Sequence, residues 1–166
     1  MKKRRRVTHA RLCEVLDYDD ETGEFYWRKR MSPRAGPGQI AGMRNRDGYR
    51  FIAIDGRIYP AHRLVWLYMT GKWRSGVIDH RDGDPSNNRW DNLRPATRSQ
   101  NCANRRIPRH NTCGLKGVSL HRGKYDALIC KKGRKYYLGR FSTAQEAQAA
   151  YAEAARKLFG EFARTE

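Results

Sequence analysis

The hydrophobic pattern divides the chain into short apolar segments separated by runs rich in Gly, Pro, Asn and charged residues. Some segments alternate apolar and polar positions, which is typical of strands, and others repeat every three to four residues, which is typical of helices. Asp55-Gly56 lies between two apolar segments and is the strongest hairpin signal, because this pair tolerates the positive φ angles of a tight turn. The first region, residues 7–60, is predicted to contain a helix capped by Thr8, strands over 24–28, 49–54 and 57–59, and a loop over 32–48.

The middle region, residues 61–105, is expected to form a hairpin, a long loop and a helix, which is the ββα order. Val77-Ile78 is a short apolar segment that leads directly into Asp79-His80. A polar, Asn-rich stretch that contains a proline follows, and this composition indicates a loop. The predicted elements are a helix over 61–70 ended by Gly71, a strand over 77–78, a loop over 83–91, a returning strand over 92–94 and a helix from Thr97 to about 104.

The third region, residues 114–163, has the pattern of three strands followed by one long helix. Thr143 and Glu146 fit a capping box at the start of that helix, and Gly160 ends it. The strands are expected near 116–121, 124–131 and 135–141, the helix over 143–159 with Ala147, Tyr151, Ala154 and Leu158 toward the sheet, a basic linker over 106–113 and a basic arm over 1–6.

Alternation along these three strands predicts two different faces of the sheet. Apolar and aromatic side chains should lie against the helix, and polar and basic side chains should lie on the other side. The face expected toward the helix carries Val118, Leu120, Tyr125, Ala127, Ile129, Tyr136 and Leu138, and the other face carries Lys116, Ser119, His121, Lys124, Lys135 and Tyr137.

The charge of the chain indicates a polyanionic partner. Lys and Arg number 35 against 17 Asp and Glu, a formal net charge of +18 in 166 residues. Between Ala103 and Arg140 there are eleven basic residues and one acid, Asp126, so the basic face is expected to bind duplex DNA through its phosphates. Four Trp, nine Tyr and five Phe allow small cores, which argues against a disordered basic tail.

Other classes of protein fit the sequence poorly. No segment approaches the roughly 18 apolar residues of a membrane helix, and no apolar segment follows the basic start as a signal peptide requires. The four cysteines form no C-x-x-C pair, which argues against a zinc ribbon, and they are expected to be reduced thiols. No obligate protein partner is evident.

Asp79-His80 and the carboxamides after it suit a one-metal nuclease. A histidine can activate water at neutral pH, and a hard divalent cation such as Mg²⁺ or Mn²⁺ prefers oxygen ligands. We expect His80 to be the general base, Asp79 and Asn101 to be metal ligands, and Asn92 to brace the loop and orient the imidazole. Asn87 and Asn88 fit turns or caps equally well, and His62 fits a packed position on its helix better than a catalytic one.

The stretch from His62-Arg63-Leu64-Val65-Trp66 through Asp79-His80 and Asn87-Asn88-Arg89 to Asn92-Leu93-Arg94 and Asn101 resembles the phage and homing branch of the HNH endonucleases. The resemblance covers about residues 14–104. It implies a ββα-metal nuclease that cuts DNA with a divalent cation, in a bacterial or phage-infected cytoplasm. His80 then matches the base, Asn92 the orienting Asn, and Asp79 and Asn101 the ligands. Asn101 stands where many members of the family have His.

The third region resembles the AP2/ERF DNA-binding domain through Gly117-Val118, Gly123-Lys124-Tyr125, Tyr137-Leu138-Gly139 and Thr143-x-x-Glu146-Ala147. That resemblance implies a three-stranded sheet in the major groove and a DNA-targeting role beside the nuclease. The expected fold is α+β, with a ββα-metal nuclease module followed by a three-stranded antiparallel sheet packed on one helix. The alternatives are a DNA-binding regulator that no longer cuts and, less well supported, an RNA-binding protein.

Overall fold

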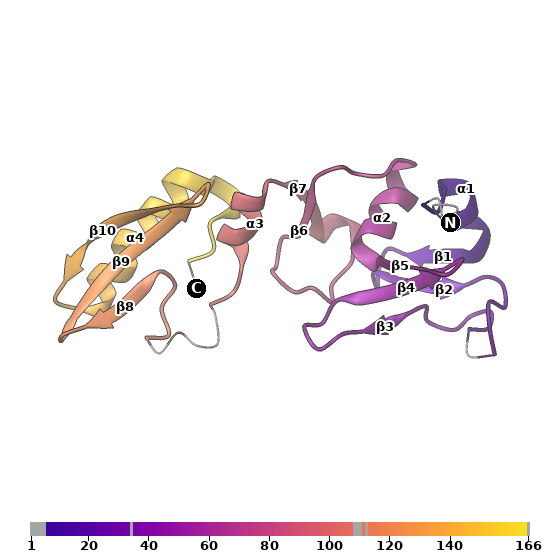
Figure 1. Ribbon diagram of the computed structural model, residues 1–166, viewed down its shortest axis with the longest axis horizontal. Coiled ribbons are helices and arrows are strands. Elements are labelled where there is room, and N and C mark those ends of the chain that lie inside the picture. Colours follow the sequence, from indigo (N-terminus) through magenta and orange to yellow (C-terminus); the bar gives the residue numbers. More distant parts are fainter. Residues whose placement is uncertain (1–5, 34, 108–110, 112, 166) are drawn as a thin grey trace, which may run out of the picture. The chain divides into compact units, whose positions relative to one another are not determined.

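The structure is a computed structural model that describes residues 6–33, 35–107, 111 and 113–165 (Figure 1). The fold is α+β and has two compact units, the first ending at Pro95 and the second beginning at Ala96. Apart from Arg6, the predicted basic arm lies outside the described residues, as do positions 108–110 and 112 of the predicted linker. Among the described residues, no helix combines the length and the apolar character needed to cross a bilayer.

In its described residues, the first unit combines two α-helices with three small sheets. The sheets are the pair β1–β2, the three-stranded sheet β3-β4-β5 and the pair β6–β7, whose second strand leads into the second unit. The elements are α1 (His9–Val15), β1 (Leu16–Asp19), β2 (Glu24–Trp27), β3 (Met43–Arg44), β4 (Arg50–Ile54), β5 (Arg57–Pro60), α2 (Ala61–Thr70), β6 (Val77–His80), the 3-10 turn η1 (Trp90–Asn92) and β7 (Leu93–Ala96).

The helix and hairpin signals of this unit are confirmed. Thr8 caps α1 through its side chain, and Gly71 ends α2 in the left-handed conformation. Asp55 and Gly56 have φ angles of 50° and 73° between β4 and β5. Strands β1 and β3 were not predicted, because a four-residue strand with two aspartates and a two-residue strand carry too little apolar pattern.

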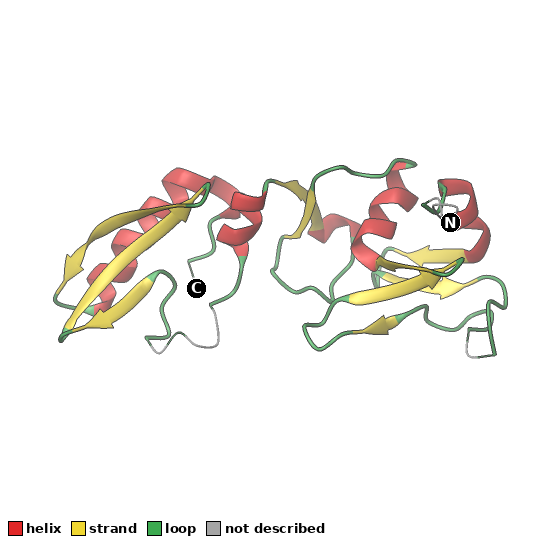
Figure 2. Ribbon diagram, in the orientation of Figure 1, coloured by secondary structure: helices red, strands yellow, loops and turns green. Residues whose placement is uncertain are grey.

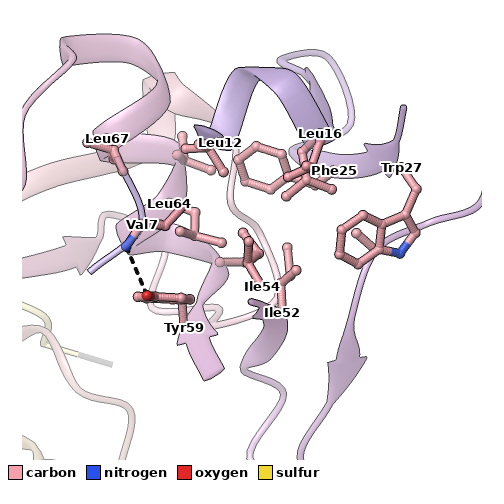
Figure 3. Packing of buried hydrophobic residues seen from close by; sticks show 14 of the residues in the cluster. Val7, Leu12, Leu16, Phe25, Trp27, Ile52, Ile54, Tyr59, Leu64 and Leu67 are labelled. Carbon is pink, nitrogen blue, oxygen red and sulfur yellow. Dashed lines mark hydrogen bonds between the residues drawn. The ribbon is translucent and has the colours of Figure 1, made fainter. Parts of the chain in front are cut away.

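One hydrophobic core holds the helices of the first unit on its sheets (Figure 3). Leu12 of α1 and Leu64 of α2 are fully buried with Phe25 of β2. The backbone N–H of Val7 donates to the hydroxyl of Tyr59 at 3.0 Å, which ties the chain before α1 to strand β5.

The second unit is a three-stranded antiparallel sheet, in the order β10-β9-β8, with helix α4 along one face (Figure 2). Capping boxes at Thr97 and Thr143 begin its two α-helices. The elements are α3 (Arg98–Asn104), β8 (Val118–His121), β9 (Lys124–Lys131), β10 (Arg134–Phe141), α4 (Ala144–Phe159) and the 3-10 turn η2 (Gly160–Phe162).

The buried face of α4 differs slightly from the predicted one. Ala147 and Tyr151 are buried as expected, together with Ala152, Ala155 and Phe159, whereas Ala154 and Leu158 are only partly buried. The buried stripe is therefore rotated by about one residue from the predicted stripe, as the 3.6-residue period of a helix allows.

The predicted faces of the sheet need three corrections. Leu120 and Tyr136 are exposed, so the apolar face extends beyond the area that α4 covers. A β-bulge lies between Tyr137 and Gly139, and it shifts the alternation of β10 so that Arg140 is paired with Asp126. Lys116 is buried instead of lying on the exposed face.

Lys116 is buried because its ammonium group donates hydrogen bonds to carbonyls at the end of helix α3. Its Nζ donates to the backbone carbonyls of Ala103 and Arg105. The last carbonyls of a helix have no partner within the helix and carry partial negative charge, so a cation satisfies them. Burial nevertheless lowers the pKa of Lys116 to about 8. The prediction that Lys116 lies on the exposed face with the other DNA-binding candidates is therefore wrong.

Candidate active site

His80 is the last residue of β6 and is only 6% exposed. Its Nε2 lies 3.2 Å from Oδ1 of Asn88, and Nδ2 of Asn88 donates to the backbone carbonyl of Ser86. A carboxamide oxygen only accepts hydrogen bonds, so the neutral His80 carries its proton on Nε2. The lone pair of the imidazole is then on Nδ1, which is the atom that can take up a proton.

Two further rings pack against the imidazole of His80. The ring centroid of His62, from α2, is 5.3 Å away, and that of Tyr49 is 6.1 Å away. Burial lowers the pKa of His62 to about 3, and the charges of His80 and Arg63 act in the same direction. His62 is therefore uncharged at neutral pH, and it shields one side of His80 without adding a competing cation.

Asp79 precedes His80 in β6 and is 3% exposed. Its Oδ2 accepts a hydrogen bond from Nε of Arg94 in β7 at 2.9 Å, and Arg94 is itself buried. The two consecutive residues thus have different partners, as alternation along a strand requires. A buried ion pair of this kind restrains the carboxylate to one orientation.

The loop after His80 is braced by Asn92. The side chain of Asn92 accepts from the backbone N–H of Asp82 at 3.1 Å and donates to Oδ1 of Asp82 and to the carbonyl of Asn87. These bonds join the two ends of the loop. The imidazole of His80 donates its hydrogen bond to Asn88 and not to Asn92, and no sequence signal favoured Asn88 over Asn87.

The β1–β2 hairpin packs against Asn88. This asparagine is 1% exposed, and its backbone carbonyl accepts from the hydroxyl of Tyr18 at 2.8 Å. Gly23, in the turn of that hairpin, has a φ of 73°, and a Cβ atom there would lie 2.6 Å from the backbone nitrogen of Arg89. The hairpin therefore fits closely against the segment that orients His80.

The donor chemistry near His80 suits a hard cation only in part. Asp79 offers a carboxylate, but the described residues contain no group of three or more His, Cys, Asp or Glu side chains able to hold a metal ion. An ion at Asp79 would need carboxamide, water or phosphate oxygens in addition, which is common for Mg²⁺. Asn101 lies on α3 in the second unit, and the units taken singly do not bring it together with Asp79 and His80.

The second unit presents the other predicted residues on one face of its sheet. The strand pairing places Ser119 opposite Asp126, His121 opposite Lys124, Tyr137 opposite Leu128 and Lys135 opposite Cys130. Directly paired residues share a face, and so do alternate residues along β9. Five of the six predicted side chains are exposed on this face, namely Ser119, His121, Lys124, Lys135 and Tyr137.

The sequence around this site is similar to that of known proteins. Residues 59–103, which include Asp79, His80, Asn92 and Asn101, match the HNH endonuclease family. The chain is 36% identical over 106 residues to Protein 3.8 of Escherichia phage T7, covering 62% of this chain and 87% of that protein. It is 35% identical to an uncharacterised HNH endonuclease of Acanthamoeba polyphaga mimivirus, covering 71% of this chain and 62% of the relative.

A third relative is the DNA endonuclease I-HmuI of Bacillus phage SP01, at 36% identity over 64 residues, 36% of this chain and 37% of that protein. A solved structure of I-HmuI, described as an HNH homing endonuclease that binds and cleaves DNA, covers 54% of this chain and 51% of its own, with 29% identity and a TM-score of 0.39. The family match and the T7 relative together carry the assignment: this chain belongs to the HNH endonuclease family.

Proposed function

We propose that this protein is a metal-dependent DNA endonuclease in which His80 is the general base. The observation that carries the proposal is the buried imidazole at the end of β6, which Asn88 fixes in one tautomer beside the carboxylate of Asp79. A buried histidine with a defined lone pair is suited to proton transfer near neutral pH. The name of I-HmuI, a DNA endonuclease, supports duplex DNA as the substrate.

In this mechanism, Nδ1 of His80 removes a proton from a water molecule that attacks the phosphorus of a phosphodiester bond. Asn88 keeps Nε2 protonated, so the base is not lost to the other tautomer. Asp79 and Asn101 would hold a divalent cation, Mg²⁺ or Mn²⁺, with Arg94 fixing the orientation of Asp79. The cation would supply charge stabilisation at the phosphoryl group and at the leaving 3′-oxygen.

The second unit is proposed to target the nuclease to DNA. Its exposed face combines Lys124 and Lys135 with Ser119, His121 and Tyr137, and such a face suits phosphates and base edges. The sequence likeness to the AP2/ERF domain supports the same role. With phage relatives, the site of action would be the interior of a phage-infected cell.

Incubation of supercoiled plasmid with the full-length protein tests the activity. We expect nicking or cutting with Mg²⁺ or Mn²⁺, none with EDTA, and none with His80→Ala, which should still bind DNA nearly as well as the wild type. His9→Ala, at an exposed histidine of α1, is the control and should cut normally. Full metal-dependent cutting by His80→Ala would refute the assignment of the base, and failure of the wild type with every metal would favour a non-cleaving DNA-binding regulator.

A further inference from the structure

The exposed face of the second unit has a polar cluster at its centre. Asp126, the third residue of β9, is the only acidic residue in strands β8, β9 and β10. Nε of Arg140 donates to its Oδ1 at 2.7 Å, and Nη2 donates to its Oδ2 at 2.9 Å. The hydroxyl of Tyr137 also donates to Oδ1. Asp126 thus holds Arg140 through two parallel hydrogen bonds, the most restrictive geometry for an arginine.

His121 completes the cluster. Its Nδ1 lies 3.2 Å from Nη2 of Arg140, and because a guanidinium can only donate, Nδ1 accepts. The imidazole therefore carries its proton on Nε2. Within the part of the chain that the structure describes, neither Nη1 of Arg140 nor Nε2 of His121 takes part in these bonds, and both are donors.

The cluster is a poor phosphate site. The hydrogen bonds from Arg140 lower the pKa of Asp126 to about 2, so the carboxylate is charged at neutral pH and balances the guanidinium. A phosphate would gain little Coulomb attraction there and would approach a carboxylate of the same sign. A neutral ligand that offers two acceptors suffers neither disadvantage.

The phosphate-binding charges lie at the two ends of the same face. Lys124 lies two residues before Asp126 on β9, and Lys135 is paired with Cys130, four residues after it. The two lysines are thus separated by roughly 20 Å at about 3.3 Å per residue. A neutral centre between two cationic ends suits the major groove, whose rims are phosphate backbones. The separation of the lysines exceeds the groove width of about 12 Å, so each lysine would lie over a rim and not inside the groove.

We propose that Arg140 and His121, held in place by Asp126, recognise a guanine in the major groove of duplex DNA. In that groove guanine presents two acceptors, N7 and O6, whereas adenine presents one acceptor and one donor, and a pair of donors selects the former. This inference rests on the proposed DNA-targeting role of the second unit and adds the base that it selects.

The test is selection of binding sites from randomised duplex DNA by the full-length protein in EDTA, which prevents cutting. The wild type should select sites with a guanine at a fixed position. Arg140→Lys keeps the charge but loses the two parallel hydrogen bonds, and it should bind the selected site roughly 5- to 150-fold more weakly, with its affinity for unrelated duplex nearly unchanged. Arg156→Lys, at an exposed arginine of α4, is the matched control and should keep the preference.

Asp126→Asn tests base recognition separately from electrostatic attraction to DNA. It removes the negative charge, so we expect tighter binding to every duplex together with a weaker preference for guanine. A guanine preference that survives Arg140→Ala would overturn the proposal, because that variant has no donor at this position. So would an Arg140→Ala variant that loses affinity equally for all sequences and lowers the salt slope by about one unit, since that result marks a phosphate contact.

Different results would contradict the proposed DNA-targeting role of the second unit. If the wild type does not bind duplex DNA in EDTA, or if Lys124→Ala and Lys135→Ala leave the affinity and its salt dependence unchanged, the face is not a DNA-binding surface and both proposals fall. If those lysine variants weaken binding while the Arg140 variants do not alter base preference, only the guanine inference fails. Thermal unfolding of each variant excludes loss of folding as the cause.

Discussion

At the scale of single residues, the candidate site depends on hydrogen bonds that fix protons in place. Asn88 binds Nε2 of His80 and is itself fixed through the carbonyl of Ser86. Loss of a residue that hydrogen-bonds to a catalytic group often lowers activity by factors of 10 to 100, because that residue orients the group and selects its tautomer. In the proposed mechanism, Asn88 therefore acts through His80 and not directly on the substrate.

Asn88→Ala should lower kcat about 10- to 100-fold, with little change in KM, because the imidazole loses its fixed tautomer. Asn88→Asp keeps an acceptor at the same place and should recover part of the rate. Cleavage kinetics and unfolding curves of both variants check this. An equal loss of rate in both variants would show that Asn88 only stabilises the loop.

His62 links the same site to acid stability. Burial holds its pKa at about 3, against 6.5 in the unfolded chain. Between these values the unfolded state binds a proton that the folded state does not, so stability falls as pH decreases below 6.5, approaching about 1.4 kcal/mol per pH unit. His62→Gln should flatten the dependence of the unfolding free energy on pH in that window, and His9→Gln should not. Parallel curves for His62→Gln and the wild type would contradict the assigned burial effect.

The sequence predicted individual roles unevenly. Asp79, His80 and Asn92 all lie in or beside one loop in the structure, as their spacing suggested. Lys116 was misplaced because alternation says nothing about a helix end that needs a cation, and Asn88 was missed because an asparagine in a turn and a buried one have the same sequence signal. The roles assigned to these residues remain predictions.

At the scale of elements, local signals predicted structure well wherever one residue type decides the backbone. The Asp55-Gly56 turn, the cap of α3 at Thr97 and the capping box of α4 are of this kind. The β-bulge in β10 has no such signal, because it arises from pairing with β9. It places Arg140 on the exposed face, where strict alternation from Lys135 and Tyr137 would not.

The β1–β2 turn offers a test of how an element distant in sequence positions the site. Gly23→Ala introduces a Cβ that meets the backbone of Asn88 and Arg89, in addition to the strain of a φ of 73°. We expect a loss of about 1–3 kcal/mol from overpacking and a lower cleavage rate, because Asn88 must shift. Gly38→Ala is the matched control, since its φ is 75° and its Cβ would meet nothing within 4 Å.

The difference between the two glycine variants isolates the contact from the backbone strain. Denaturant unfolding and the plasmid assay should show Gly38→Ala slightly destabilised and fully active. If Gly23→Ala cuts as fast as Gly38→Ala, the hairpin does not position Asn88 in the way that its close packing suggests.

At the scale of the whole molecule, the formal net charge of +18 makes the salt dependence of the proposed DNA binding an informative measurement. Each phosphate contact releases counterions and adds about 0.9 to the slope of log affinity against log salt. Substitutions of two lysines of the second unit should affect this slope differently. Lys124 is exposed on the sheet, whereas Lys116 is buried against the end of α3. Their side chains are chemically the same, so their surroundings decide what each contributes.

Lys124→Ala should therefore lower the salt slope for duplex binding by about one unit and weaken binding similarly for all sequences. Lys116→Met should leave the slope unchanged but destabilise the protein by about 1–3 kcal/mol, because two carbonyls at the end of α3 lose their donor. Affinity measured over a range of salt concentrations in EDTA, with unfolding curves for each variant, separates the two effects. A slope that falls with Lys116→Met and not with Lys124→Ala would mean that the positive charge reaching the DNA phosphates comes from the other side of the sheet.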